Sequence, residues 1–224
     1  MRLVFMGDSL TWGGYGGNFV DEVAQLLPAH EVINAGIGGN TVINLLARLD
    51  DMLALEPDGV FVMTGGNDAI SYSQPGVRTY YRLTHGAPDG RMTPDLFTRS
   101  YRDLLTRLQL HYIQTWVGLE STEYSGELAE TLQMFNALAA EEARALNVPV
   151  LDLTAYFPPG TQSHHPPVTE EYIGLIGKRA RAGWSDYERE RERGGFTWSF
   201  DGMHITPAAA RRMGAVIVDF LGIA

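Results

Sequence analysis

The sequence predicts a three-layer α/β/α protein, in which helices cover both faces of a mainly parallel sheet of five strands. Short apolar runs typical of strands alternate along the chain with longer segments whose apolar residues recur at helical spacing. The run from Gly59 to Met63 is continuously apolar, which is typical of a strand that is buried on both faces. Alternating strands and helices form βαβ units with right-handed crossovers, so the strands are expected to run parallel.

The first strand covers residues 2–6 and leads into a turn that carries a serine. The remaining strands are expected at residues 31–34, 59–63, 111–119 and 148–153. The helices between and after them are expected at residues 18–27, 41–55, 95–109, 125–146 and 206–221. Pro28 ends the first helix, and Thr206 followed by Pro207 is a favourable start for the last. No repeat or linker divides the chain, so residues 1–224 are expected to form a single domain.

Two long inserts interrupt this alternation, at about residues 71–94 and 156–200. The first is expected to be irregular, and the second contains an aromatic-bearing, charge-rich segment in which residues 188–193 are expected to form a solvated helical face. Long loops in compact domains usually have a function or are disordered. The aromatic side chains in and near them either line a pocket or pack the inserts onto the domain: Trp12, Tyr72, Tyr80, Tyr81, Trp184, Tyr187, Trp198 and Phe200.

The overall composition excludes several classes of protein. A net charge of −10 argues against general binding to nucleic acid or to an anionic membrane. The absence of cysteine excludes disulfides, thiolate metal sites and a cysteine nucleophile. No stretch approaches the ~18 consecutive apolar residues of a membrane span. Because the chain begins directly at its first strand with no signal peptide, a cytoplasmic location is the default expectation, and a secreted protein trimmed to its mature form stays open.

Ser9 follows the first strand directly, at the edge of the sheet where open α/β proteins bind their ligands. A serine in a turn is often only a turn residue, and it becomes a useful nucleophile only beside a base. His204, three residues after Asp201, is the candidate base. That spacing allows Asp201 to hydrogen-bond one ring nitrogen and leaves the other facing Ser9. The alternative interpretation is that Asp201 only caps a turn and that His204 is an ordinary surface histidine.

Two glycine-rich loops follow the second and third strands and can supply hydrogen-bond donors. Gly39 lies in the first loop, where the lack of a Cβ lets the backbone N–H approach a ligand. Asn67 lies in the second loop and has a side-chain amide that can donate to a developing oxyanion. With the backbone N–H of Ser9 these groups would form an oxyanion hole, in which each donor is worth a factor of ~10²–10³ in rate. Either loop could also be only a tight turn.

The four motifs together resemble the GDSL or SGNH hydrolase family, which is named for Ser, Gly, Asn and His in successive blocks. The blocks match Gly7 to Leu10, Asn34 to Thr41, Gly65 to Asp68, and Asp201 to His204, in the right order and across most of the chain. The resemblance implies a flavodoxin-like fold, a triad of Ser9, Asp201 and His204, and oxyanion donors from Ser9, Gly39 and Asn67. The sequence departs from many relatives at Gly38, where they carry serine, and in the length of its two inserts.

Other motifs fit less well. The residues around Ser9 read G-x-S-x-T rather than the G-x-S-x-G of α/β-hydrolases, and neither a dinucleotide-binding fingerprint nor a P-loop is present. His164 and His165 raise the question of a metal site, but adjacent side chains rarely converge on one ion, so a polar insert is the favoured interpretation.

The sequence therefore predicts a serine esterase that needs no metal or organic cofactor and acts on a small ester. Because the chain offers no clear acyl tunnel, short acyl groups such as acetyl, carried by a polar alcohol such as carbohydrate, are expected. Asp8, Trp12, Tyr72 and Trp198 are the candidate substrate-binding residues. Two alternatives stay open: an acylhydrolase of the lysophospholipase or thioesterase type, and a non-catalytic carbohydrate-binding module on the same fold. The sequence makes no prediction of the oligomeric state.

Overall fold

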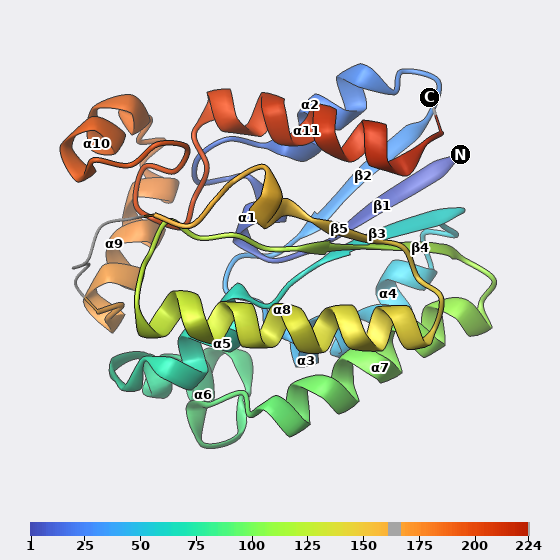
Figure 1. Cartoon of the computed structure of the whole chain (residues 1–224), viewed down its shortest axis with the longest axis horizontal. Helices are drawn as coiled ribbons and strands as arrows, with labels where there is room; N and C mark the ends of the chain where they lie inside the picture. Colours follow the sequence, from blue (N-terminus) through green and yellow to red (C-terminus); the bar gives the residue numbers. More distant parts are fainter. Residues whose placement is uncertain (161–166, 224) are drawn as a thin grey trace.

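The computed structural model describes residues 1–160 and 167–223, and it contains one parallel sheet with helices on both faces (Figure 1). The predicted fold class is confirmed. The strands lie in the order β2-β1-β3-β4-β5, which gives an all-parallel sheet. Their bounds are β1 (Arg2–Gly7), β2 (Glu31–Gly36), β3 (Gly59–Met63), β4 (Gln114–Leu119) and β5 (Val150–Asp152).

The register of the sheet brings three loops to one level. Gly7, the last residue of β1, lies opposite Gly36 of β2 on one side and Met63 of β3 on the other. The loops that follow these strands therefore begin side by side at the carboxyl edge. These are the loops in which the sequence analysis places Ser9, Gly39 and Asn67.

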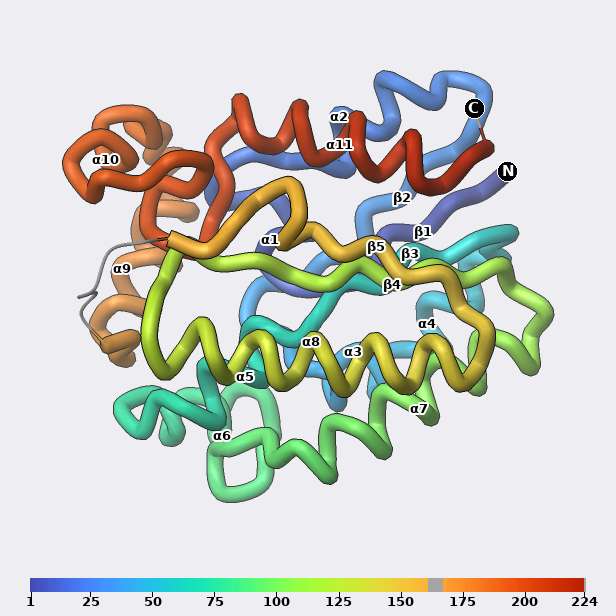
Figure 2. Tube along the Cα trace, in the orientation of Figure 1, coloured from blue at the N-terminus to red at the C-terminus, as the bar shows by residue number. Residues whose placement is uncertain are grey.

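Two hydrophobic cores lie on opposite faces of the sheet. Phe61 and Met63 of β3 pack on the face covered by α2 (Phe19–Leu26) and α11 (Pro207–Leu221). The alternate residues of the same strand face a second core, covered by α3 (Val42–Ala47), α7 (Pro94–Leu110) and α8 (Glu127–Ala145). Both chain ends lie at the amino edge of the sheet, opposite the loops of interest (Figure 2). Strands covered on both faces explain the continuously apolar run in the sequence.

Two predicted elements differ most from their expected bounds. The helix expected at residues 41–55 is divided at Arg48 into α3 and α4 (Leu49–Leu53). The strand expected from residue 111 begins at Gln114, because α7 continues to Leu110 and His111 forms its C-terminal cap.

The insert at residues 71–94 is helical, so the expectation of an irregular loop is wrong. It contains the end of α5 (Gly66–Ser73), α6 (Arg78–His85) and the short 3-10 turns η1 (Pro75–Val77) and η2 (Pro88–Gly90). These helices are too short to show a clear apolar period, and only a few side chains such as Val77 and Tyr81 point into the core. Tertiary packing therefore determines their conformation.

The insert at residues 156–200 contributes α9 (Glu170–Arg181) and α10 (Tyr187–Gly194), which lie at the carboxyl edge of the sheet (Figure 1). The short turn η3 (Leu153–Ala155) precedes it. Ion pairs at a spacing of three residues run along α10, between Arg191 and Glu188 and between Arg193 and Glu190. His164 and His165 lie outside the described residues. The interpretation of the chain as a single domain stays a prediction.

Within the described residues, no helix combines the length and the apolar character needed to cross a membrane.

Candidate active site

Ser9 is held at the edge of the sheet by a tight turn. It is the first residue of the one-turn helix α1 (Ser9–Trp12), which follows β1 after Asp8. Asp8 caps that helix, with its Oδ1 accepting a hydrogen bond of 3.0 Å from the backbone N–H of Leu10. Gly7 has no room for a side chain, because a Cβ would meet Thr11 and the carbonyl oxygen of Met63. The turn thus presents the hydroxyl of Ser9 to the pocket.

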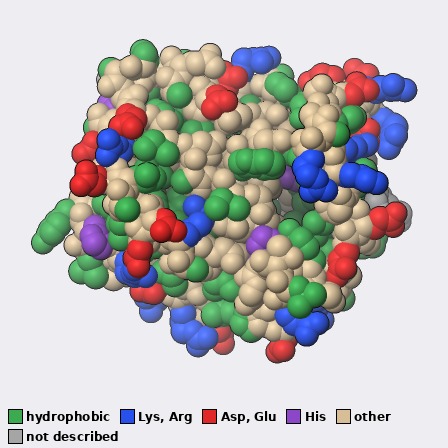
Figure 3. Space-filling model, turned by 180° about the vertical axis from the view of Figure 1, so that it is seen from behind, with side chains coloured by type: hydrophobic (Ala, Val, Ile, Leu, Met, Phe, Trp, Pro, Cys, Tyr) green, Lys and Arg blue, Asp and Glu red, His purple; other side chains and the backbone are tan. Residues whose placement is uncertain are grey.

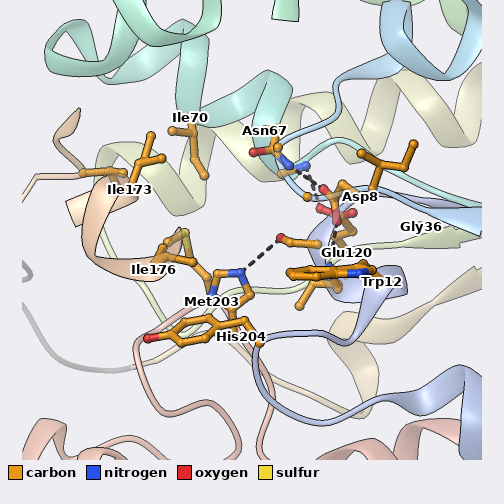
Figure 4. A pocket seen from close by; sticks show the side chains of 18 of the residues that line it. Asp8, Trp12, Gly36, Asn67, Ile70, Glu120, Ile173, Ile176, Met203 and His204 are labelled. Atoms are coloured by element: carbon orange, nitrogen blue, oxygen red, sulfur yellow. Dashed lines mark hydrogen bonds between the residues drawn. The ribbon is translucent and has the colours of Figure 1, made fainter. Parts of the chain in front are cut away.

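His204 lines the pocket (Figure 4), and its ring lies between Ser9 and Asp201. Its Nε2 is 3.1 Å from the Oγ of Ser9, a residue 195 positions away in the sequence. Its Nδ1 is 2.8 Å from Oδ2 of Asp201. The other carboxylate oxygen of Asp201 accepts from the backbone N–H groups of His204 at 2.7 Å and of Met203 at 3.0 Å. The structure therefore aligns a hydroxyl, an imidazole and a carboxylate, which is the geometry of a Ser-His-Asp triad.

The ion pair sets the protonation of these groups. Burial alone would lower the pKa of His204, but the charge and the hydrogen bond of Asp201 outweigh burial and raise that pKa above 6.5. Burial opposes ionisation of Asp201 as well, yet His204 and the two backbone donors hold the pKa of Asp201 below 3.8. Asp201 thus stays ionised, and its charge beside Nδ1 favours the protonated form of the His204 imidazole.

A buried carboxylate anchors the loop that carries Asp201 and His204. Glu123 follows β4 and is 3% exposed. Its Oε2 accepts from the backbone N–H groups of Trp198 and Ser199 and from the Ser199 hydroxyl, at 2.6 to 3.0 Å. Its Oε1 accepts from the N–H of Thr197 at 2.7 Å. Through Glu123, the segment after β4 holds the backbone of residues 197–199 in place, just before Asp201.

Aromatic rings pack behind the imidazole and limit its movement. The ring of Tyr15 meets that of His204 edge-on with centroids 5.1 Å apart, and the ring of Phe200 lies 6.2 Å away on a nearly parallel plane. Trp184 and Tyr187 from the second insert pack in turn on Phe200. These insert aromatics therefore support the histidine from behind and do not line the pocket.

The two glycine-rich loops bring further donors to the same pocket. Gly39 has φ of +79°, which favours glycine, and a Cβ there would lie 2.5 Å from Nε2 of His85. Arg48 ties this loop to the first strand, since it donates to Asn40 Oδ1 and to the carbonyl oxygen of Gly7, each at 3.0 Å. Asn67 lies on the first turn of α5 and lines the pocket with its side chain.

A group of buried carboxyl groups lies beneath Ser9. Asp8, Asp68 and Glu120 are each at most 2% exposed. Burial raises the pKa of Asp68 to about 8 and, together with the charge of Asp8, raises the pKa of Glu120 well above 4.5. Burial also raises the pKa of Asp8, but the donors Leu10 and Asn67 oppose the shift, so Asp8 is the member best suited to stay ionised.

The pocket has a volume of about 550 Å³ and two unlike sides. On one side of Ser9 it is apolar, with Ile173 and Ile176 of α9 facing Ile70 and Met203 (Figure 4). On the other side lies Trp12, whose side chain is 42% exposed. In Figure 3 the end of the molecule that carries α9 and α10 is at the right. A hollow opens there among hydrophobic side chains, with a histidine at its edge.

The candidate substrate-binding residues divide into two groups. Asp8 and Trp12 line the pocket. Tyr72 and Trp198 do not: Tyr72 packs edge-on against Phe135, and the indole N–H of Trp198 donates to the carbonyl oxygen of Pro158 at 3.0 Å. Their placement corrects the sequence-based expectation. Both residues are held by packing, because an aromatic residue in an insert serves the core as readily as a pocket.

Two supporting residues were not expected from the sequence: Glu123, and Tyr15 behind the histidine. For Glu123, its place in the loop after the strand that ends at Leu119 was the available signal, since a carboxylate in that loop falls at the functional edge of the sheet. From the sequence, Tyr81 is only one of several insert aromatics, whereas in the structure its hydroxyl contacts Asn67.

Residues 5–174 match the GDSL-like lipase/acylhydrolase family. The chain belongs to that family. An acetylxylan esterase of Geobacillus stearothermophilus is 38% identical over 86 residues, a match that takes in 30% of this chain and 39% of the relative. The chain thus matches well under half the length of this curated relative.

Solved structures show the same fold over the whole length. A crystal structure of an acetylxylan esterase from Geobacillus stearothermophilus superposes with a TM-score of 0.68 at 20% identity, covering 100% of this chain and 94% of that one. A lipase/acylhydrolase from Enterococcus faecalis gives 0.63 at 22% identity, covering 97% and 93%. At this level of identity the likeness concerns the fold.

Proposed function

We propose that this protein is a serine esterase that hydrolyses carboxylic esters through an acyl-enzyme. The observation that carries the proposal is the alignment of Ser9, His204 and Asp201, with separations of 3.1 Å and 2.8 Å, at the floor of an open pocket. Membership of an acylhydrolase family supports the same chemistry.

In the first half of the reaction, Ser9 Oγ attacks the ester carbonyl while Nε2 of His204 accepts its proton. The resulting tetrahedral oxyanion collapses, the C–O bond to the alcohol breaks, and His204 returns the proton to the departing alcohol. In the second half, water attacks the acyl-enzyme and gives its proton to the same nitrogen. The bond between the acyl carbon and Ser9 Oγ then breaks, His204 returns the proton to Oγ, and the acid is released. Asp201 stabilises the imidazolium in both halves.

The oxyanion is proposed to bind the backbone N–H groups of Ser9 and Gly39 and the side-chain amide of Asn67. All three residues line the pocket beside the hydroxyl. Donors that are fixed before the reaction stabilise the charge as it forms without reorganising, which is the largest catalytic contribution in many acyl-transfer enzymes.

We propose a small ester as substrate, in the first place a short acyl group such as acetyl on carbohydrate. The acetylxylan esterase similar to this chain supports that substrate class. Trp12 supports it too, because a partly exposed indole at the pocket edge offers a flat apolar face on which a sugar ring can stack. The net charge of −10 favours a neutral carrier over nucleic acid.

A second candidate is favoured by one observation. The side of the pocket formed by Ile70, Ile173, Ile176 and Met203 is apolar and could take a longer acyl chain. No sequence pattern predicts this apolar side of the pocket, because its residues come from separate helices and loops. An acylhydrolase of the lysophospholipase or thioesterase type would bind its acyl chain on this apolar side.

The third interpretation is a non-catalytic carbohydrate-binding module, in which Ser9, His204 and Asp201 would catalyse no reaction. The cytoplasmic location expected from the sequence stays a prediction.

Two assays test these proposals. Ser9→Ala should abolish hydrolysis of p-nitrophenyl acetate while the melting temperature stays that of the parent, and full turnover by this variant would remove Ser9 from the mechanism. A series of p-nitrophenyl esters from C2 to C12, with acetylated xylo-oligosaccharide alongside, separates the substrate classes. A maximum of kcat/KM at C2 to C4 supports the acetyl class, whereas a maximum at C8 or beyond supports the long-chain alternative.

A further inference from the structure

The helix α6 of the first insert touches the amide of Asn67. The hydroxyl of Tyr81 donates to Oδ1 of Asn67 at 2.6 Å. Nδ2 of the same amide donates to Oδ2 of Asp8 at 2.7 Å. Tyr81 is 1% exposed and Asp8 is 2% exposed, so water does not compete for either bond. A buried chain of hydrogen bonds therefore runs from the insert, through Asn67, to the turn that carries Ser9.

This chain allows only one orientation of the amide. A carboxylate accepts hydrogen bonds and cannot donate them, so the nitrogen of Asn67 must face Asp8 and the oxygen must face Tyr81. The hydroxyl of Tyr81 is consequently the donor in its bond. Burial raises its pKa well above 10, so it keeps its proton at neutral pH. Among the residues that the structure describes, the Asn67 nitrogen has no second acceptor, which leaves one amide hydrogen for a ligand in the pocket.

We propose that Tyr81 is a positioning residue of the oxyanion hole, because its hydroxyl holds the amide of Asn67 in the orientation that aims the free N–H at the reacting carbonyl oxygen. The inference rests on the proposed function and deepens it. It assigns to the insert at residues 71–94 a part in the chemistry of Ser9, although no residue of α6 is a member of the triad.

The same helix supports the second donor loop. The imidazole of His85 and the hydroxyl of Tyr80, 2.9 Å apart, lie where a Cβ on Gly39 would be. The carbonyl oxygen of His85 accepts from the side chain of Asn44 at 2.8 Å, which ties the end of α6 to α3. Both donors beyond Ser9 itself are thus supported by α6, and Tyr81 contacts the Asn67 amide directly through a hydroxyl that one substitution removes.

The test is Tyr81→Phe, which removes that hydroxyl and keeps the ring. We expect kcat for p-nitrophenyl acetate to fall about tenfold with KM unchanged, since the lost interaction acts on the transition state and a small misplacement of a donor is costly. Asn67→Ala should cost about 10²–10³ in kcat. In the Asn67→Ala background, Tyr81→Phe should have no further effect, because the amide that it positions is gone.

Tyr101→Phe is the matched control. Tyr101 is also fully buried, and within the described residues its hydroxyl has no hydrogen-bond partner, so kcat should stay at the parental value. All rates are divided by the active-site concentration from titration with a serine-directed phosphonate, so that misfolded molecules are not counted. Parental kcat in Tyr81→Phe, or an equal loss in both backgrounds, would overturn the inference. If the proposed function itself is wrong and Ser9 is not the nucleophile, Ser9→Ala would instead keep its activity.

Discussion

Replacing Asp201 by asparagine tests how the triad histidine is oriented. In the parent, Oδ1 of Asp201 accepts from two backbone N–H groups and Oδ2 accepts from Nδ1–H of His204. An asparagine keeps the two backbone bonds only if its oxygen takes the place of Oδ1. Its NH₂ group then faces Nδ1, so His204 must give up its proton there and carry it on Nε2.

The magnitude follows from that change of tautomer. With a hydrogen on Nε2, the nitrogen 3.1 Å from Ser9 Oγ can no longer accept a proton. The same substitution in a Ser-His-Asp triad lowers kcat by about 10⁴, which corresponds to about 5 kcal/mol of transition-state stabilisation. The opposite orientation of the asparagine would keep the active tautomer, but it places two amide hydrogens against two backbone N–H groups and is disfavoured.

The assay is kcat for p-nitrophenyl acetate between pH 6 and 10, with the melting temperature as a check on folding. We expect a loss of about 10⁴ at neutral pH for Asp201→Asn. Asp152→Asn is the matched control, because this exposed aspartate also accepts from a backbone N–H, that of Thr154, and lies outside the pocket. A loss smaller than about tenfold in a folded Asp201→Asn protein would refute the argument that Asp201 selects the tautomer.

Three further predictions concern other parts of the site. Because the pKa of His204 is raised and its neutral form is the base, kcat/KM should fall as the pH is lowered through a midpoint above 6.5; a midpoint below 6.5 would contradict the raised pKa. Gly39→Ala should lower kcat by about 10² or more, since a Cβ at φ of +79° meets His85 and displaces the N–H donor; kinetics at the parental level would exclude Gly39 from the oxyanion hole. Glu123→Ala should lower the free energy of unfolding by about 3–5 kcal/mol in urea denaturation, because its buried donors lose their acceptor, and a change below about 1 kcal/mol would show that the loop before the triad does not depend on it.

The sequence was sufficient to place the candidate residues at strand ends on one edge of the sheet. Ser9, Gly39 and Asn67 follow three strands whose apolar runs are easy to recognise, and parallel strands bring their carboxyl ends to one edge. Asp201 and His204 are three residues apart, so their contact is local and could be inferred from spacing. The family blocks coincide with these positions.

The supporting contacts could not be predicted from the sequence, because they depend on how distant segments pack. Tyr81 reaches Asn67 across 14 positions and Glu123 reaches Ser199 across 76. Neither side chain belongs to a motif with fixed spacing. Tyr72 and Trp198 show the converse error, since an aromatic side chain in an insert has no feature that separates a pocket wall from a core residue. The helices of the first insert were not predicted either, because their conformation depends on packing against distant segments.

Covalent labelling by a p-nitrophenyl alkylphosphonate at neutral pH tests most directly whether Ser9 is the nucleophile, with mass spectrometry of the intact chain and of its peptides as the readout. We predict one phosphonyl group per chain, carried by Ser9, with loss of esterase activity in proportion to labelling and no reaction in Ser9→Ala. Labelling at another residue, or a fully labelled chain that still hydrolyses ester, would contradict it.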